Sequence, residues 1–107
     1  MNLQEIFGKL QEMKQKMQEV QDNLAHLRAH GESGGGLVKA TVNGLKQVVH
    51  LEIDKSLFKT PEDTEMISDL VIAAINQALQ NAEEKSREEL QKTTANFLPN
   101  LPGINFF

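Results

Sequence analysis

The sequence contains no cysteine, no tryptophan and no tyrosine. Without cysteine the chain can form neither a disulfide nor a thiolate metal site, and this composition fits a reducing compartment. The longest uninterrupted apolar run, Leu70 to Ile75, is far too short to cross a bilayer. The N-terminal residues carry charges and glutamines throughout, unlike a secretory signal peptide. We therefore expect a cytoplasmic protein with no membrane partner.

The sequence also lacks an excess of basic residues. Its 11 Lys and Arg are outnumbered by 15 Asp and Glu, which gives a net charge of −4. Non-specific DNA-binding domains are usually basic, so the summed charge counts against a nucleic-acid partner. With 107 residues the chain can form one domain with a modest core, and small proteins of this kind often gain stability by pairing with a second copy.

A regular apolar seam marks the first segment as a helix. Apolar residues recur at alternating spacings of three and four, the heptad pattern of a coiled coil: Leu3, Ile6, Leu10, Met13, Met17, Val20, Leu24 and Leu27. The flanking positions are mostly polar, which favours one facing helix. Packing of the seam on the chain's own sheet or second helix is the alternative. We predict a helical arm over residues 1–30, ended by Gly31 as its C-cap.

Residues 31–55 change to a period of two, which predicts a small antiparallel sheet. The turn Asn43-Gly44 joins two strands as a two-residue or four-residue hairpin loop. Its predicted inward residues are Val38, Ala40, Val42, Val49, Leu51 and Ile53. Two strands alone are marginal, so we expect a third strand, from residues 31–36 or from a partner's sheet.

A second long helix is predicted over residues 60–96. It begins at Thr60-Pro61, a helix N-cap followed by proline in the first turn. An apolar stripe to cover the sheet follows: Ile67, Leu70, Val71, Ala74, Ile75, Ala78, Leu79 and Ala82. Residues 83–92 are polar and project into solvent or along a partner. The tail, residues 97–107, is expected to dock because Phe97, Phe106 and Phe107 would otherwise be exposed.

The order of elements predicts one α+β domain over residues 1–107, with both helices on one side of the sheet. The glycine run could suggest a phosphate-binding loop. However, no GxxxxGK[ST] motif is present, and a strand follows the run where a dinucleotide-binding loop has a helix. We interpret Gly34, Gly35, Gly36 and Gly44 as structural. Gly34 and Gly36 are placed on the inward face, where a missing Cβ lets a helix approach.

Candidate catalytic and metal-binding groups are few. His26 and His30 have the four-residue spacing of helical metal ligands, but no third ligand is tied to them, so surface histidines in the last helical turn are favoured. An acidic cluster follows the second apolar stripe, and it is interpreted as a solvated helix face: Glu83, Glu84, Glu88 and Glu89. We therefore predict no enzyme activity, no metal, no cofactor and no small-molecule substrate.

Four stretches carry a resemblance to a known family: GGGLVKATVNG, VVHLEID with SLF, DTEMISDLVIAAINQALQNAEEKS, and LPGINFF. They resemble the YbaB/EbfC family of bacterial nucleoid-associated proteins, over nearly the whole chain. The turn VNGLKQV departs from many relatives, which have another glycine after the NG. The resemblance implies a tweezer-shaped homodimer with projecting helical arms. It also implies binding of DNA with low sequence specificity, altered DNA conformation, and a role in nucleoid organisation and gene regulation.

By the resemblance, DNA contacts belong to basic residues of the helical arms. On this chain these are Lys9, Lys14, Lys16 and Arg28, with Lys85, Arg87 and Lys92 as second choices. The first three lysines flank the seam, so an acidic chain can still present a basic edge, and local potential sets the affinity for a polyanion. The alternative is that these lysines bind no DNA and are either solvated at the rim of the seam or paired with residues across the coil. At the level of function, the alternative is a coiled-coil protein-interaction adaptor with incidental DNA affinity.

Overall fold

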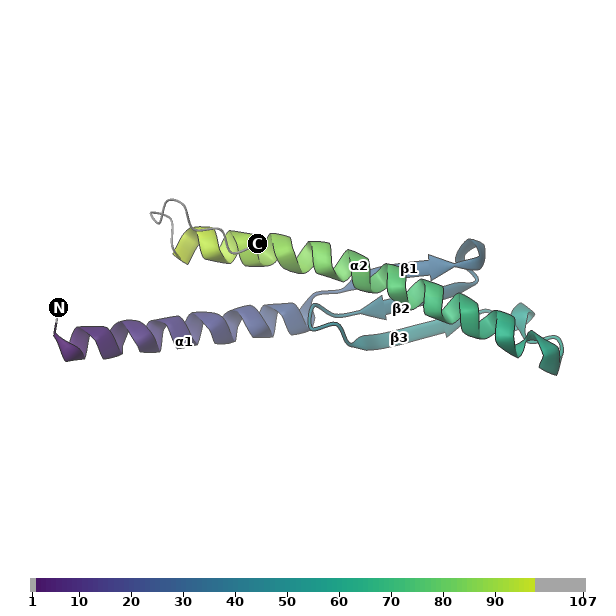
Figure 1. Cartoon of the computed structure of the whole chain (residues 1–107), viewed down its shortest axis with the longest axis horizontal. Coiled ribbons are helices and arrows are strands. Elements are labelled where there is room, and N and C mark those ends of the chain that lie inside the picture. Colours follow the sequence, from purple (N-terminus) through teal and green to yellow (C-terminus); the bar gives the residue numbers. More distant parts are fainter. Residues whose placement is uncertain (1, 98–107) are drawn as a thin grey trace.

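The computed structural model describes residues 2–97, with side chains described for residues 2–92. The main elements are two helices, α1 (Leu3–His26) and α2 (Thr64–Phe97), and three strands, β1 (Ala29–Ser33), β2 (Val38–Val42) and β3 (Val48–Ile53). The strands form one antiparallel sheet in the order β1-β2-β3. Helix α2 crosses one face of the sheet, and α1 extends away from the end of the sheet (Figure 1).

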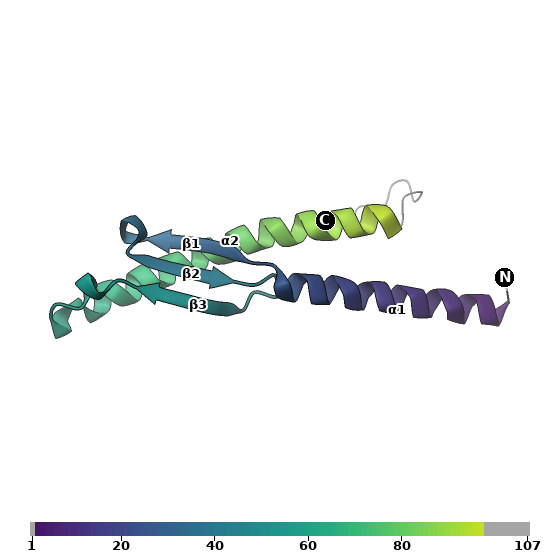
Figure 2. The same cartoon turned by 180° about the vertical axis from the view of Figure 1, so that it is seen from behind.

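This arrangement confirms the α+β class and the third strand. It corrects the expectation that both helices lie on one side of the sheet, because only α2 covers the sheet face (Figures 1 and 2). Helix α1 and the C-terminal half of α2 instead project from the same end of the sheet. The molecule is accordingly long and thin, with principal extents of 71 × 25 × 16 Å.

The core lies between α2 and the inner face of β1 and β2. On β2 this face carries Val38, Ala40 and Val42, all at most 1% exposed. Their partners on β1 are small: Ser33, Gly31 and Ala29. The facing stripe of α2 is also small, with Ala74, Ala78 and Ala82 fully buried, and the predicted apolar stripe otherwise packs around this contact. Small residues on both sides let the helix backbone approach the sheet closely.

Gly31 is the tightest point of this contact. A Cβ atom added to Gly31 would collide with the backbone carbonyl oxygen of Ala74 and the backbone nitrogen of Ala78. The prediction that Gly31 caps the first helix is therefore wrong. Helix α1 ends at His26, Leu27 is already extended, and Gly31 lies at the centre of β1. The predicted 1–30 arm is four residues too long, because residues 29–33 pair with β2.

Gly34, Gly35 and Gly36 form the turn between β1 and β2. Their φ angles are +61°, +69° and +92°, a left-handed region that favours glycine. They form the chain reversal between the two strands. Their predicted place on the inward strand face is wrong, since the close approach to α2 is made at Gly31.

The β2–β3 hairpin joins the sheet to the end of α1. Gly44 donates its N–H to the carbonyl oxygen of Leu24 at 2.8 Å, and a Cβ atom there would lie 2.7 Å from that oxygen. The loop spans residues 43–47, longer than either predicted form, and Lys46 adopts φ +64°. A bulge follows, in which Val48 pairs with Val42.

The bulge changes one member of the predicted inward set. Leu51 and Ile53 pair with Ala40 and Val38, as expected for the inner face. Val49 was expected to follow them, but the register shift places it in the bulge, and Val48 takes the position opposite Val42. Alternation along β3 could not reveal this shift because both residues are valine.

Asn43 organises the hairpin loop from a buried position, 4% exposed. Its Oδ1 accepts the N–H groups of Leu45 and Gln47 at 2.9 and 3.0 Å, and its Nδ2 donates to Gln47 Oε1 at 2.8 Å. We expect Asn43→Ala to lower the free energy of unfolding by about 2 kcal/mol, because two backbone donors lose their acceptor. Urea unfolding followed by circular dichroism measures this. Gln47→Ala, which removes one side-chain bond, is the control and should cost less than half as much.

The remaining turns lie at the other end of the sheet. Asp54 Oδ1 accepts the Ser56 N–H at 2.8 Å, and hydrogen bonds from Ser56 hold the pKa of the Asp54 carboxyl below its ordinary value because they favour its charged form. The predicted cap at Thr60 is present, but it begins a short 3₁₀ turn, Pro61–Asp63, that leads into α2. The predicted docking of Phe97, Phe106 and Phe107 concerns side chains outside the described residues.

Candidate nucleic-acid interface

Helix α1 is a projecting arm over most of its length. Asn2 caps its start by accepting the Glu5 N–H at 2.8 Å. Only Val20 and Leu24 of α1 are buried, both close to the sheet. Residues 2–19 are all exposed, so every side chain in this stretch is accessible to a partner (Figure 1).

The apolar seam therefore lies mostly in the open. Its exposed members are Leu3, Ile6, Leu10, Met13 and Met17, with exposed fractions between 38% and 69%. Leu27, the last predicted member, lies beyond the helix and packs against the core. The seam is thus not packed on the chain's own sheet, except at its C-terminal end. These five exposed residues, from Leu3 to Met17, form the α1 seam.

Lys9, Lys14 and Lys16 lie on this exposed arm. Lys16 forms an ion pair with Glu19 at 3.8 Å, with both side chains more than half exposed. Such surface pairs contribute little and exchange readily with other partners. Within residues 2–92, Lys9 and Lys14 have no ion-pair partner. Three ammonium groups of α1 are therefore available to phosphate oxygens.

Arg28 and Lys85 meet at the base of the arm. The Arg28 guanidinium donates to the carbonyl oxygens of Ala25 and Leu27 at 2.9 and 3.0 Å. Lys85 Nζ donates to the carbonyl oxygen of Arg28 at 2.8 Å. These carbonyls are left without helical partners where α1 ends. The structure thus gives both residues a role in fixing the junction of α1, β1 and α2.

A shallow groove separates the two projecting helices near the sheet. Its lining residues come from α1, the hairpin loop and α2: Leu24, Gly44, Lys46, Glu83, Ser86, Arg87, Leu90 and Gln91. Arg87 forms an ion pair with Glu83 at 3.7 Å. Lys92 is exposed further along α2. The predicted basic residues therefore fall into three places: the α1 arm, the junction, and the α2 side of the groove.

Lys46 is a basic residue of this groove that the sequence did not single out. It follows the Asn43-Gly44 turn, so a lysine at a hairpin tip was the available signal. Nothing in the sequence tells which end of the sheet the hairpin faces. The Gly44–Leu24 hydrogen bond holds the loop at the end of α1, and Lys46 lines the same groove as Arg87.

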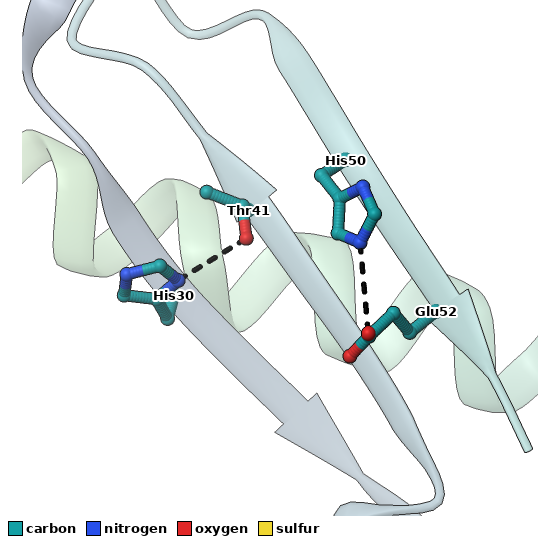
Figure 3. Close-up of polar contacts among 4 residues, drawn as sticks. All are labelled: His30, Thr41, His50 and Glu52. Carbon is teal, nitrogen blue, oxygen red and sulfur yellow. Dashed lines mark hydrogen bonds and ion pairs between the residues drawn. The ribbon is translucent and has the colours of Figure 1, made fainter.

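The outer face of the sheet is polar. His30 Nδ1 lies 3.1 Å from Thr41 Oγ1, and His50 Nε2 lies 3.7 Å from Glu52 Oε1 (Figure 3). His30 belongs to β1, so its predicted place in the last turn of α1 is wrong. His26 ends α1 with Nδ1 2.8 Å from the carbonyl oxygen of Asp22.

Among the side chains that the structure describes, no three His, Asp or Glu come together as a possible metal site. None of the helices in the described part of the chain is both long and apolar enough to span a bilayer.

The fold and this surface define a small α+β protein whose projecting helical arms carry exposed lysines, which can contact a polyanion. Comparison with known proteins gives the family. The profile of the YbaB/EbfC DNA-binding family matches residues 1–97. The chain therefore belongs to the YbaB/EbfC DNA-binding family, and its role is DNA binding. This family is not a family of enzymes.

Two bacterial relatives carry the name nucleoid-associated protein. The chain is 42% identical over 97 residues to a nucleoid-associated protein of Chlorobium phaeobacteroides, an alignment covering 91% of this chain and 85% of the relative. It is 39% identical over 103 residues to one of Caldanaerobacter subterraneus, covering 96% and 90%. The crystal structure of an uncharacterized Helicobacter pylori protein superposes with a TM-score of 0.70 at 31% identity, covering 92% of this chain and 98% of that one.

Proposed function

We propose that this chain is a homodimeric nucleoid-associated protein of the bacterial cytoplasm. It binds DNA with low sequence specificity and alters its conformation, contributing to nucleoid organisation and gene regulation. The names of its relatives support the nucleoid role. The observation that carries the proposal is the exposed α1 arm with Lys9, Lys14 and Lys16. The same proposal includes no catalytic activity, no cofactor and no small-molecule substrate.

Low sequence specificity follows from the chemistry of this surface. Lysine ammonium groups bind phosphate oxygens as point charges, and phosphate contacts position a protein without reading base edges. On α1 the lysines flank the apolar seam, whose side chains offer no hydrogen bonds to bases. Lys46, Arg87 and Lys92 extend the same cationic surface across the groove to α2. Arg28 and Lys85 are assigned to the base of the arm, where their charge adds to the local potential.

The sheet supports the proposed homodimer. β3 is an edge strand with exposed apolar side chains: Val48 is 47% exposed, Val49 43% and Leu51 38%. An open edge next to uncovered apolar surface is typical of a site that pairs with another chain. We assign this surface to the second copy. Two arms then supply about six to eight phosphate contacts, enough for measurable binding by an acidic protein.

Gel shifts with duplex DNA at two salt concentrations test the proposed function. We expect a shift at 50 mM salt and an affinity about tenfold or more lower at 200 mM, because each phosphate contact releases bound counterions. Light scattering on the same samples should give the mass of two chains. A single-chain mass together with no shift at 50 mM would contradict the proposal.

The α1 seam favours one second candidate, a coiled-coil adaptor that binds another protein. Five exposed apolar residues on a heptad can accept a helix of a different chain. Under this alternative the DNA shift would be absent at physiological salt, while a helical protein partner would bind in the same buffer. A DNA shift at physiological salt without binding of a helical protein partner favours the first function, and the reverse pair of results favours the adaptor.

A further inference from the structure

The α1 seam lies on the side of α1 that faces the groove. The same apolar stripe continues inward to Leu24, which lines the groove opposite residues of α2. The five seam residues are exposed, and within residues 2–92 no other element buries them. A continuous apolar strip of this kind, rimmed by polar residues, is typical of a surface that binds another segment.

The segment that follows α2 has the composition to cover such a strip. Residues 98–107 contain five large apolar residues, two prolines and no charged residue. The prolines, Pro99 and Pro102, oppose a helix and favour the extended polyproline II conformation. In that conformation every third residue lies along one edge, and the residues at this spacing are all apolar: Leu98, Leu101, Ile104 and Phe107.

The repeat of this edge is close to the repeat of the α1 seam. Polyproline II rises about 3.1 Å per residue, so successive edge residues lie about 9 Å apart. Along α1 the heptad separates Leu3, Leu10 and Met17 by about 10.5 Å each. The difference over two repeats is about 2 Å, which side-chain rotamers can accommodate. The edge of the segment can therefore lie along the seam in register.

The position of α2 brings the segment within reach of the seam. Leu90 of α2 and Leu24 of α1 line the same groove. Seven residues further along α2 is its last residue, Phe97, and seven residues back along α1 is Met17, so α2 ends level with the inner end of the seam (Figure 1). Ten extended residues span at most about 33 Å, and the seam from Met17 to Leu3 rises about 21 Å. About 12 Å is left for the crossing from α2 to α1, and packed helices are about 8–10 Å apart.

We propose that residues 98–107 dock along the α1 seam of the same chain, with one edge of the segment facing the seam: Leu98, Leu101, Ile104 and Phe107. Because the segment is tethered within reach, its local concentration at the seam is on the order of millimolar, which favours it over a separate molecule. The segment has no charge, so Lys9, Lys14 and Lys16 gain no ion-pair partner and stay exposed on the flanks. The docking concerns one chain and does not depend on the proposed function.

Tryptophan fluorescence tests the docking, because the natural chain has no tryptophan. Phe107→Trp places an indole on the edge that faces the seam. A docked indole is shielded from water and from a dissolved quencher. We expect emission at shorter wavelength, and an acrylamide quenching constant about threefold or more below that of a peptide of residues 95–107 with the same change, because the tethered segment is mostly docked.

Two double variants in the Phe107→Trp background show where the segment docks. Leu10→Gln with Met13→Gln removes the centre of the seam, and quenching should rise to that of the peptide. Both residues are exposed and glutamine is a good helix former, so α1 should stay helical by circular dichroism. The control, Met66→Gln with Ile72→Gln, changes two exposed apolar residues of α2 and should leave quenching unchanged. Quenching of the parent equal to that of the peptide, or shielding that survives the seam variant, would overturn the proposal.

Cysteine cross-linking shows which chain supplies the segment, because the natural chain has no cysteine. Met13→Cys with Asn100→Cys puts thiols in the seam and in the segment, and Gln15→Cys with Asn100→Cys puts the first thiol on the opposite face of α1. With a short bis-maleimide, we expect the first pair to give at least about fivefold more product within one chain than the second pair. Equal yields from the two pairs would contradict docking on the seam.

A mixed sample separates one chain from two. Chains with Met13→Cys alone are mixed with chains with Asn100→Cys alone, and the same reagent should give little product that joins two chains. A two-chain product as abundant as the one-chain product of the double variant would mean that a second copy supplies the segment, and would overturn docking within the same chain.

Discussion

Replacing Gly31 with alanine is expected to lower the free energy of unfolding by about 3 kcal/mol or more, because the added methyl group meets backbone and not a mobile side chain. The colliding atoms belong to Ala74 and Ala78, which lie in the middle of α2. Relief requires α2 to move off the sheet and to open the contact with Ala40 and Val42. Small domains are stable by only about 5–15 kcal/mol, so this loss is a large share of the total.

The matched control is Gly8→Ala, the same change on α1. Nothing lies within 4 Å of a Cβ atom at Gly8, and alanine is a better helix former, so stability should rise by about 0.5–1 kcal/mol. Urea unfolding of both variants, followed by circular dichroism, gives effects of opposite sign. A Gly31→Ala protein as stable as the parent would show that α2 does not lie against β1 as described.

Gly31 also shows why the sequence predicted one boundary wrongly. β1 reads Ala-His-Gly-Glu-Ser, and its inward residues are Ala29, Gly31 and Ser33, none of them large or apolar. No apolar alternation marks this strand. The small inward residues of β1 fit against the alanine stripe of α2, which lies more than forty residues further along the chain. Only the packing of the two elements makes small residues favourable there, and local patterns do not carry that information.

The α1 seam shows a second limit of prediction from sequence. Heptad spacing correctly predicted a helix, and Leu10 and Met17 of its predicted seam are exposed on that helix. The spacing could not tell what covers them. Charge sorting predicts the lysines of the arm as DNA contacts, whereas Lys46 enters the groove between the helices only through the direction of a hairpin. Periodicity constrains single elements, whereas the site depends on how they are joined.

Reversing the charge of Lys9, Lys14 and Lys16 together is expected to weaken DNA binding about 100-fold or more at 50 mM salt. In a dimer the triple Lys→Glu change removes six phosphate contacts and places six carboxylates where they stood. The dependence of the binding constant on salt should also become much shallower, since fewer counterions are released. Gel shifts from 50 to 200 mM salt measure both effects, and circular dichroism checks that α1 stays helical.

A control of equal charge distinguishes location from net charge. Lys39, Lys55 and Lys59 are all exposed, on the outer sheet face and in the turns at the end of the sheet away from the arms (Figure 1). Changing these three to Glu lowers the net charge by the same amount as the arm variant. If DNA is held by the arms, the control should keep its affinity within about threefold, because the exchanged charges are away from the arms and salt screens their effect. Equal losses in the two variants would mean that overall charge, and not the α1 arm, governs the affinity for DNA.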